Sequence, residues 1–154
     1  MQSFNALKER TKDILNLKYA TALLEWDQQT YMPEGAAEAR ASQIATLSKL
    51  AHEMLTADET WKLIEAAERE VDTNSDSLEV AIVRITKRDF ERSNKLPSQF
   101  VAEFAATTAM AHEIWVKARA NNDYAAFLPT LEKIFDLCRQ QAEYLGYEDH
   151  IYDA

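Results

Sequence analysis

Two His–Glu pairs are the residues of this sequence best suited to metal chemistry. They lie in "HEMLT", which begins at His52, and in "HEIWV", which begins at His112. An HExxH pattern places two histidines on one helix face around zinc, with the glutamate beside the metal-bound water. Thr56 and Val116 occupy the positions of the second histidines. The sequence therefore predicts structural roles for both histidines, and for His52 a place off the apolar stripe near a helix end whose dipole favours a cation.

The remaining reactive side chains give no catalytic pattern either. A ferritin-like di-iron site needs a Glu three residues before each ligand histidine, and the residues three before His52, His112 and His150 are Lys, Ala and Tyr. The single cysteine, Cys138, falls on an expected apolar stripe, which favours an inert core thiol over a nucleophile. No glycine-rich phosphate loop or serine elbow occurs. We expect no catalytic residue, no metal ligand and no cofactor site in this chain.

A run of arginines forms a basic face on one expected helix. Arg84, Arg88 and Arg92 are spaced i, i+4, i+8, so they share one side of that helix. We favour a solvated helix face with local ion pairs over a docking surface for this side. Asp89 is expected to pair with one of these arginines.

The segment "EWDQQTYMPEGAAEAR", residues 25–40, mixes apolar surface with hydrogen-bonding groups beside one of the few prolines. Pro33 pushes Met32 toward an extended backbone and Gly35 relieves strain, so the chain is expected to turn here. Composition alone does not decide between a structural corner and the wall of a groove. The candidate corner or groove residues are Trp26, Asp27, Gln28, Tyr31, Met32, Pro33 and Gly35.

These residues must be positioned by helices. The chain has 154 residues, one domain's worth, with only 2 Gly and 3 Pro and with 47% hydrophobic and 28% charged residues, a composition that favours helix. We predict an all-α fold, a bundle of about six helices with antiparallel neighbours. The expected spans are about Phe4–Gln28, Ala36–Leu55, a helix beginning at Thr56, Leu78–Lys95, a helix beginning at Pro97, and a last main helix that has Pro129 in its first turn and stops before Gly146.

Several details of these helices are predicted from local patterns. The second half of the first helix, "YATALLEW", is apolar nearly all round, so this helix should be central. Thr56 with Glu59 resembles a capping box for the third helix, and Asp76 with Glu79 can cap the fourth. Two buried stripes are expected, one of Phe100, Phe104, Ala111, Trp115 and Ala118, and one of Leu128, Leu131, Phe135, Cys138, Ala142 and Leu145.

Charge and hydropathy bound the location and the partners. A formal charge of −9 and a pI near 4.8 disfavour binding to nucleic acid or to an anionic membrane. No apolar leader and no apolar run long enough to cross a bilayer is apparent in the sequence. The single cysteine fits a reducing compartment. We therefore expect a cytoplasmic protein with neither membrane nor nucleic-acid partners.

The stretch "WDQQTYMPEGAAEARASQIATLSKLAHEML" resembles the N-terminal motif of the carboxypeptidase Taq family, zinc metallopeptidases that remove C-terminal amino acids. "RDFERSNKLP" and "FLPTLEKIFDLCRQQAEYLGY" resemble later stretches of that family in the same order. The resemblance implies an all-α fold in proteins several times longer, often homodimeric, whose HExxH site binds zinc or cobalt beyond the region matched here. Residues 1–154 would then be a single helical domain that is incomplete relative to the family fold.

This resemblance implies a groove-flanking N-terminal region of a zinc-dependent carboxypeptidase, catalytically silent alone because HExxH is absent. Its expected partner is the missing C-terminal catalytic region or a second copy of the chain. The alternative is a stand-alone helical self-association or interaction module derived from that family; hydrolysis through an unrecognised site has little support. If the segment 26–35 faces a groove, Asp27→Ala in a complete homologue should lower turnover more than melting temperature.

Overall fold

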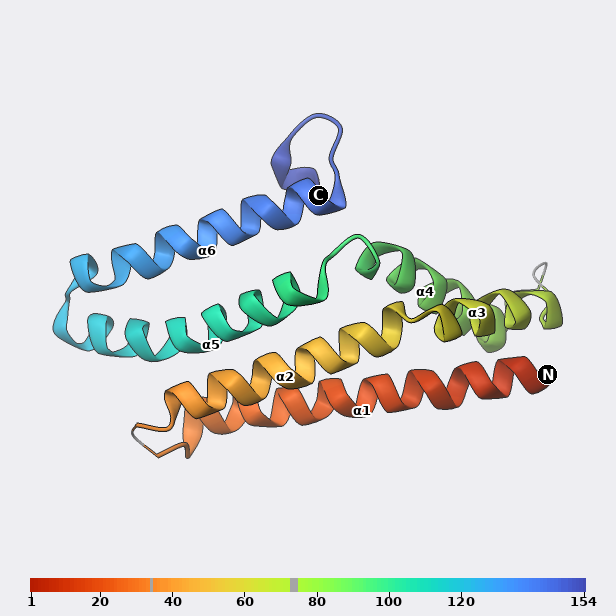
Figure 1. Ribbon diagram of the computed structural model, residues 1–154, viewed down its shortest axis with the longest axis horizontal. Coiled ribbons are helices and arrows are strands. Elements are labelled where there is room, and N and C mark those ends of the chain that lie inside the picture. Colours follow the sequence, from red (N-terminus) through yellow and green to blue (C-terminus); the bar gives the residue numbers. More distant parts are fainter. Residues whose placement is uncertain (34, 73–74) are drawn as a thin grey trace.

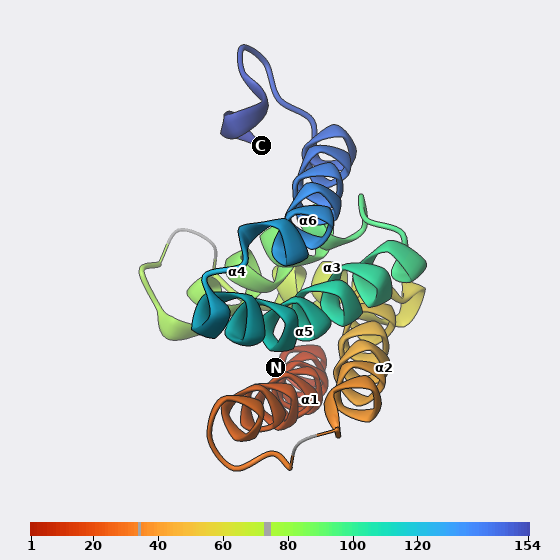
Figure 2. The same ribbon diagram turned by 90° about the vertical axis from the view of Figure 1, so that its left-hand side faces the viewer.

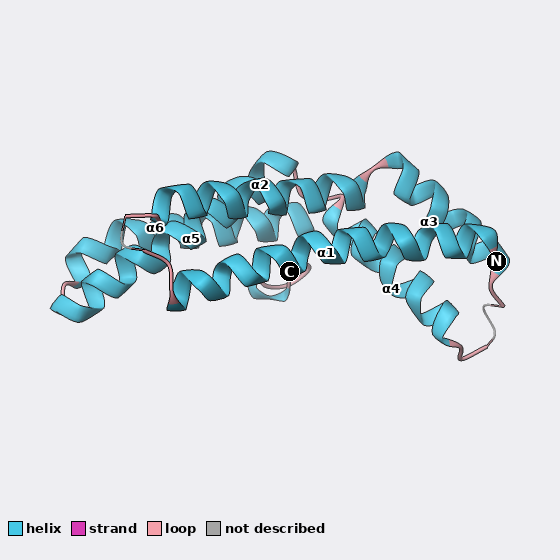
Figure 3. Ribbon diagram, turned by 90° about the horizontal axis from the view of Figure 1, so that it is seen from below, coloured by secondary structure: helices cyan, strands magenta, loops and turns pink. Residues whose placement is uncertain are grey.

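Most of the described residues lie in helices, as the composition predicted. The computed structural model describes residues 1–33, 35–72 and 75–154, which hold six α-helices, one short 3-10 helix and no strand (Figure 3). The elements are α1 (Gln2–Thr30), α2 (Ala37–Thr56), α3 (Asp58–Glu70), α4 (Leu78–Ser93), α5 (Ser98–Asn121), α6 (Tyr124–Leu145) and the 3-10 helix η1 (Ile151–Asp153). The predicted all-α fold of about six helices is confirmed.

The helices are stacked in layers. Helices α1 and α2 run antiparallel and side by side, α5 packs along α2, and α6 folds back on α5 as the outermost layer (Figures 1 and 2). Helices α3 and α4 close the end of the bundle at which the chain begins (Figure 1). The packed neighbours α1 and α2, α2 and α5, and α5 and α6 run antiparallel, as predicted, whereas the short α2–α3 and α4–α5 connections continue the chain in nearly the same direction (Figure 1).

A hydrophobic cluster joins the first half of α1 to α3 and α4. Leu7 of α1 and Ile64 of α3 are fully buried, and Val83 of α4 is nearly so. The rings of Trp61 and Phe90 lie 5.0 Å apart at the edge of this cluster. Burial of side chains of this size contributes roughly 1.5–3 kcal/mol each to folding, so this end of the bundle is the main source of stability.

A second, smaller cluster joins α2 to α5. Ala41 and Ile44 of α2 meet Ala109 of α5, with Leu24 of α1 packed against them. Small side chains let two helix backbones approach closely, so α2 and α5 form the most extensive helix pair of the bundle. This cluster supports the second half of α1 and the turn that follows it.

Helix α1 is not central, contrary to our prediction. Tyr19, Leu23 and Trp26 expose 66%, 63% and 54% of their surfaces. The nearly all-round apolar pattern predicted cover on several sides, but α1 lies at the edge of the bundle (Figure 2). The described helices of this chain cover only the opposite side of α1.

The predicted helix starts need correction. Thr56 ends α2 and its hydroxyl donates to the His52 carbonyl oxygen at 2.9 Å, so it does not cap α3, whose N-cap is Ala57. Ser77, not Asp76, caps α4 by accepting a hydrogen bond from the Val80 amide. In both cases a neighbouring residue occupies the N-cap position, a shift that local spacing does not reveal.

The start of α5 and the buried face of α6 also differ from the prediction. Pro97 is the N-cap of α5 rather than its first residue. Helix α6 begins at Tyr124, so Pro129 lies inside it. Leu137 is buried, whereas Cys138 is exposed and Phe135 exposes 54% of its surface. The prediction of a core thiol is wrong, because Leu137 rather than Cys138 takes the buried position, whereas Ala142 and Leu145 of the expected stripe are buried.

The end of α6 is held by a lysine from the α4–α5 connection. Lys95 Nζ donates to the Leu145 carbonyl oxygen at 2.6 Å. A cation at a helix C-terminus also interacts favourably with the helix dipole. Gly146 follows with a φ of +80°, a conformation that favours glycine, so the predicted end of the helix is confirmed.

A glutamate from α3 caps the start of α1. The Ser3 and Phe4 amides donate to the two carboxylate oxygens of Glu70 at 3.0 and 3.1 Å, and the N-terminal amine lies 3.0 Å from the same group. These hydrogen bonds, to Phe4 first and Ser3 second, lower the pKa of Glu70 to about 2. The first turn of α1 is thus fixed to the end of α3.

We expect Glu70 to make the folded state sensitive to acid. Because its pKa is lower in the folded state, its contribution is fully present above pH 4.5 and is lost as the pH falls from about 4.5 toward 2. The difference in unfolding free energy between the wild type and Glu70→Ala, measured by urea unfolding across this range, should shrink toward zero. Glu132→Ala, at an exposed position of α6, is the control. A difference that stays constant with pH would contradict this account.

Candidate functional site

The corner between α1 and α2 contains the residues singled out in the sequence. The Tyr31 and Met32 amides both donate to the Asp27 carbonyl oxygen at 2.9 Å, which ends α1 in a tight turn. Gly35 has a φ of +88°, which L side chains rarely adopt. Glu34, inside the segment 26–35, lies outside the described residues. The predicted chain reversal is present (Figure 1).

Arg40 is the residue that holds this corner together. Its Nη2 donates to the Asp27 carboxylate at 2.6 Å, and its Nη1 donates to the Leu24 carbonyl oxygen at 2.6 Å. Only 13% of the Arg40 side chain and 33% of the Asp27 side chain is exposed. The pair connects the start of α2 to the end of α1. The role of Arg40 was missed because a separation of thirteen residues across a turn matches no helical spacing.

The aromatic residues of the corner lie on its outer surface. The rings of Trp26 and Tyr31 meet edge to face with centroids 5.6 Å apart. Trp26 is 54% exposed and Tyr31 is 76% exposed. The pair gives the corner an aromatic outer surface rather than a packed interior.

Gln28 attaches the corner to α5. Its side-chain amide donates to the Ala109 carbonyl oxygen at 2.7 Å. A pocket of about 230 Å³ lies beside this contact, lined by Glu25, Gln28, Gln29, Ile44, Ala105, Thr108, Ala109 and His112. Gln28 therefore lines a hollow between α1, α2 and α5, whereas the side chain of Asp27 is engaged by Arg40. The prediction that Asp27→Ala affects turnover more than stability stays a prediction.

The histidines occupy different environments. His52 is buried on α2, and burial lowers its pKa, an effect that a hydrogen bond with the Leu96 backbone opposes. The expected cation at a helix end, off the apolar stripe, is therefore wrong, because His52 packs inward and the neutral form is favoured. His112, on α5, lies with its ring 6.3 Å from that of Trp115. His150 caps η1 and accepts a hydrogen bond from the Tyr152 amide.

The side chains of the described residues do not fit a zinc centre. Across residues 1–33, 35–72 and 75–154, no group of three or more His, Cys, Asp or Glu side chains is placed to hold a metal ion. His52, His112 and His150 belong to separate elements. No step of a metal-dependent reaction follows from these residues.

The basic face of α4 is exposed, which is compatible with both a solvated helix side and a docking surface. Arg88 pairs with Asp89 at 3.0 Å, so the predicted pairing of Asp89 with an arginine is confirmed. Lys87 donates to both Glu68 oxygens, at 2.9 and 2.8 Å. A pocket of about 370 Å³ between α3 and α4 is lined by Glu68, Val71, Val80, Val83, Arg84, Lys87, Arg88 and Glu91. Arg84, Arg88 and Arg92 all lie on the exposed surface.

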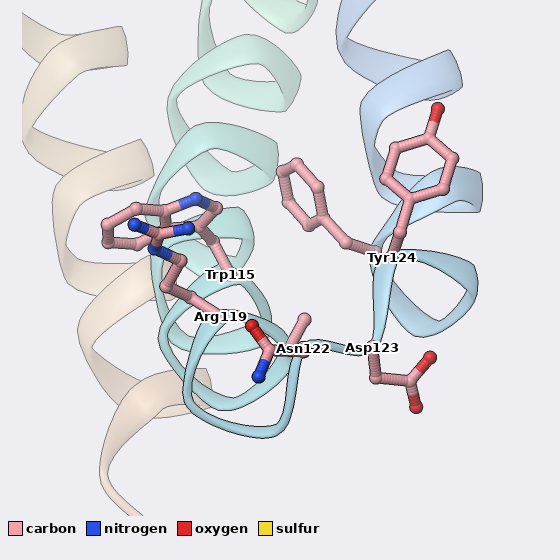
Figure 4. Close-up of a pocket in the computed structure, with 7 residues that line it drawn as sticks. Trp115, Arg119, Asn122, Asp123 and Tyr124 are labelled. Atoms are coloured by element: carbon pink, nitrogen blue, oxygen red, sulfur yellow. The ribbon is translucent and has the colours of Figure 1, made fainter.

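The α5–α6 connection forms a pocket that the sequence patterns did not indicate. Asn122 adopts a φ of +52° between the two helices. The pocket, of about 280 Å³, is lined by Trp115, Ala118, Arg119, Asn122, Asp123, Tyr124 and Phe127 (Figure 4). Trp115 was expected in a buried stripe but is 47% exposed, whereas Ala111 and Ala118 of the same stripe are buried.

A helix that crosses a bilayer must be both long and apolar. None of the helices in the described part of the chain is both long and apolar enough to cross a bilayer.

Comparison with known proteins gives one consistent answer. The family model described as carboxypeptidase Taq (M32) metallopeptidase matches residues 6–154. Thermostable carboxypeptidase 1 of Pyrococcus furiosus is 34% identical over 99% of this chain and 30% of its own length. Carboxypeptidase 1 of Bacillus subtilis is 30% identical over 93% of this chain and 28% of its own length.

Two solved structures have a region with the same fold as this chain. A crystal structure titled BsuCP superposes with a TM-score of 0.91 at 25% identity, covering 99% of this chain and 31% of that one. The structure of Pyrococcus furiosus carboxypeptidase gives a TM-score of 0.74 at 32% identity, covering 99% and 30%. This chain thus spans about 30% of the length of the relatives it matches, and the matched part is N-terminal.

Proposed function

The chain belongs to the carboxypeptidase Taq (M32) metallopeptidase family, and on that premise we propose that it forms the N-terminal, groove-flanking part of a zinc-dependent carboxypeptidase that removes C-terminal amino acids. The observation that carries the proposal is the match of residues 6–154 to a family whose relatives are about three times as long. We also propose a cytoplasmic location, which the single cysteine suggests.

The contribution of this chain is structural support for the groove. Arg40 fixes the end of α1 against the start of α2, and Gln28 fixes α1 against α5. These contacts hold Glu25, Gln29 and His112 around one hollow. In the complete enzyme a metal would supply an activated water; we propose that its ligands lie outside this chain and that this chain is catalytically silent alone.

The test compares the chain alone with a fusion. The purified chain, assayed with added zinc or cobalt, should release no C-terminal residues from peptides and should hold no stoichiometric metal. A fusion of the chain to the remaining region of the Pyrococcus furiosus relative should release them. Metal binding and turnover by the chain alone would contradict the silent role, and an inactive, folded fusion would contradict the groove-flanking role.

The second candidate is a self-association module derived from the family. Exposed apolar side chains on several helices, such as Leu23, Leu78 and Phe135, favour it, because such surface promotes association. Size-exclusion chromatography with light scattering should then give one defined dimer over a range of concentrations. Strong dye binding with no defined oligomer would instead support the groove-flanking part of a larger enzyme.

A further inference from the structure

One side of the second half of α1 carries a continuous apolar surface. Leu15, Tyr19, Leu23 and Trp26 are spaced by four, four and three residues, so they share that side. They expose 40%, 66%, 63% and 54% of their surfaces. At 1.5 Å per residue the row is about 16 Å long. We refer to these four residues as the α1 stripe.

The same side of α1 changes character along the helix. Lys8 and Lys12 precede Leu15 at the same spacing and are exposed, with Lys12 paired to Glu9 at 3.0 Å. The first half of this side is therefore suited to water, and the second half is not. A change from lysine to large apolar side chains within one helix side indicates a covered surface that begins at Leu15.

The packing of this chain accounts only for the opposite side of the helix. Ile14 and Thr21 are buried there, and Leu24 packs against the α2–α5 cluster. The Asp27–Arg40 pair and the Gln28–Ala109 contact then fix the rotation of α1 about its axis. The α1 stripe therefore faces away from the core of this chain, and the contacts on the other side of α1 fix that orientation.

A second copy of this chain is a poor fit to the α1 stripe. Four side chains at about half exposure offer roughly 400 Å² on each copy. A stable protein interface buries roughly 800 Å² on each partner. Self-pairing of the α1 stripe alone therefore falls short. Packing within one fold does not need that area, because its two surfaces are already covalently joined, and about 70% of the relatives' length lies outside the part matched by this chain.

We infer that the α1 stripe is the surface on which the remaining region of the M32 carboxypeptidase fold packs, with apolar side chains against Tyr19, Leu23 and Trp26. This inference rests on the proposed function and names the contact surface within it. The inference also explains why "YATALLEW" is apolar nearly all round. Its exposed side is covered only when the remaining region is present.

Thiol labelling measures this contact directly. Leu23→Cys is introduced with Cys138→Ser, because the native thiol is exposed. Labelling of this site by a maleimide is followed by peptide mass spectrometry in the chain alone and in the fusion to the remaining region of the Pyrococcus furiosus relative. We expect the rate to fall at least tenfold in the fusion. Lys62→Cys, on the exposed side of α3, is the matched control and should label equally in both.

The outcomes separate the inference from the proposed function. Equal labelling of Leu23→Cys in the chain and in an active fusion overturns the inference and leaves the proposed function intact. Protection in a folded but inactive fusion supports the inference and contradicts the proposed function. Protection in the chain alone that rises with concentration identifies a second copy as the occupant and overturns the inference.

A second measurement needs no fusion. Leu23→Lys combined with Trp26→Lys in the chain alone should lower the fluorescence of a bound hydrophobic dye at least twofold while leaving helicity unchanged, because both side chains are already exposed. Phe135→Lys, another exposed apolar position, is the control and should have a smaller effect. Unchanged dye binding in the double variant would contradict the α1 stripe as a docking surface.

Discussion

Arg10→Ala is expected to lower the free energy of unfolding by about 3 kcal/mol. Arg10 Nε donates to the Thr60 hydroxyl at 2.6 Å, and Nη2 donates to the Met54 carbonyl oxygen at 3.2 Å. Thr60 is fully buried and itself donates to the Met54 carbonyl at 2.7 Å. Removing the guanidinium leaves the buried Thr60 hydroxyl oxygen without its donor, and leaves the Met54 carbonyl oxygen with the Thr60 hydroxyl but without the charged one.

Urea unfolding followed by circular dichroism measures this effect. The ion pair of Arg10 with Glu59 contributes little, since 71% of the Glu59 side chain is exposed. Glu59→Ala should therefore change the free energy of unfolding by less than about 0.5 kcal/mol, a value typical of exposed pairs. Lys12→Ala, on the exposed side of the same helix, is a further control. A loss in Arg10→Ala no larger than in these controls would show that the network does not stabilise the fold.

Arg40→Ala is expected to lower the free energy of unfolding by about 2 kcal/mol. The substitution leaves the Asp27 carboxylate and the Leu24 carbonyl oxygen without the donors that lie 2.6 Å from them. Asp27→Ala should cost less, and the double variant should cost no more than Arg40→Ala alone, because the two residues act as a pair. The measurement is a double-mutant cycle by urea unfolding, with Arg139→Ala at an exposed ion pair as the control.

The same variants decide the role of the corner in catalysis. In an active fusion with the remaining region of a relative, Asp27→Ala and Arg40→Ala are assayed for turnover and melting temperature. If turnover and melting temperature fall together in both variants, the Asp27–Arg40 pair has a structural role only. A fall in turnover for Asp27→Ala well beyond its thermal effect would instead support contact with the groove. Additive losses in the unfolding cycle would contradict the pair itself.

The fold was largely predictable because helical composition and periodicity are local properties. Gly146 ended α6 as expected, since a positive φ requires no distant partner. The starts of helices were less predictable, because Ser77 and Asp76 are chemically equivalent caps and only the path of the chain selects one. The orientation of α6 depends on the surface of α5, so the exposure of Cys138 could not be predicted from the sequence of α6 alone.

The candidate site was predicted as a location but not as a geometry. The turn at Pro33 and Gly35 follows from local backbone preferences. The pairing of Asp27 with Arg40, and of Gln28 with a carbonyl of α5, depends on contacts between helices that are distant in sequence. The apolar pattern of "YATALLEW" predicted a helix covered on several sides, whereas its Tyr19, Leu23 and Trp26 side chains are exposed in this chain.

The attachment of α6 has a consequence for folding cooperativity. Helix α6 packs mainly on α5 and is tied at its far end by Lys95, while Asn122, in the left-handed region, and Asp123 form the short hinge between the two helices. Opening at this hinge breaks one helix–helix interface and leaves the α1–α5 core intact. We therefore expect helix α6 to open as a separate foldon, with its amides exchanging with solvent through sub-global openings before those of the other helices.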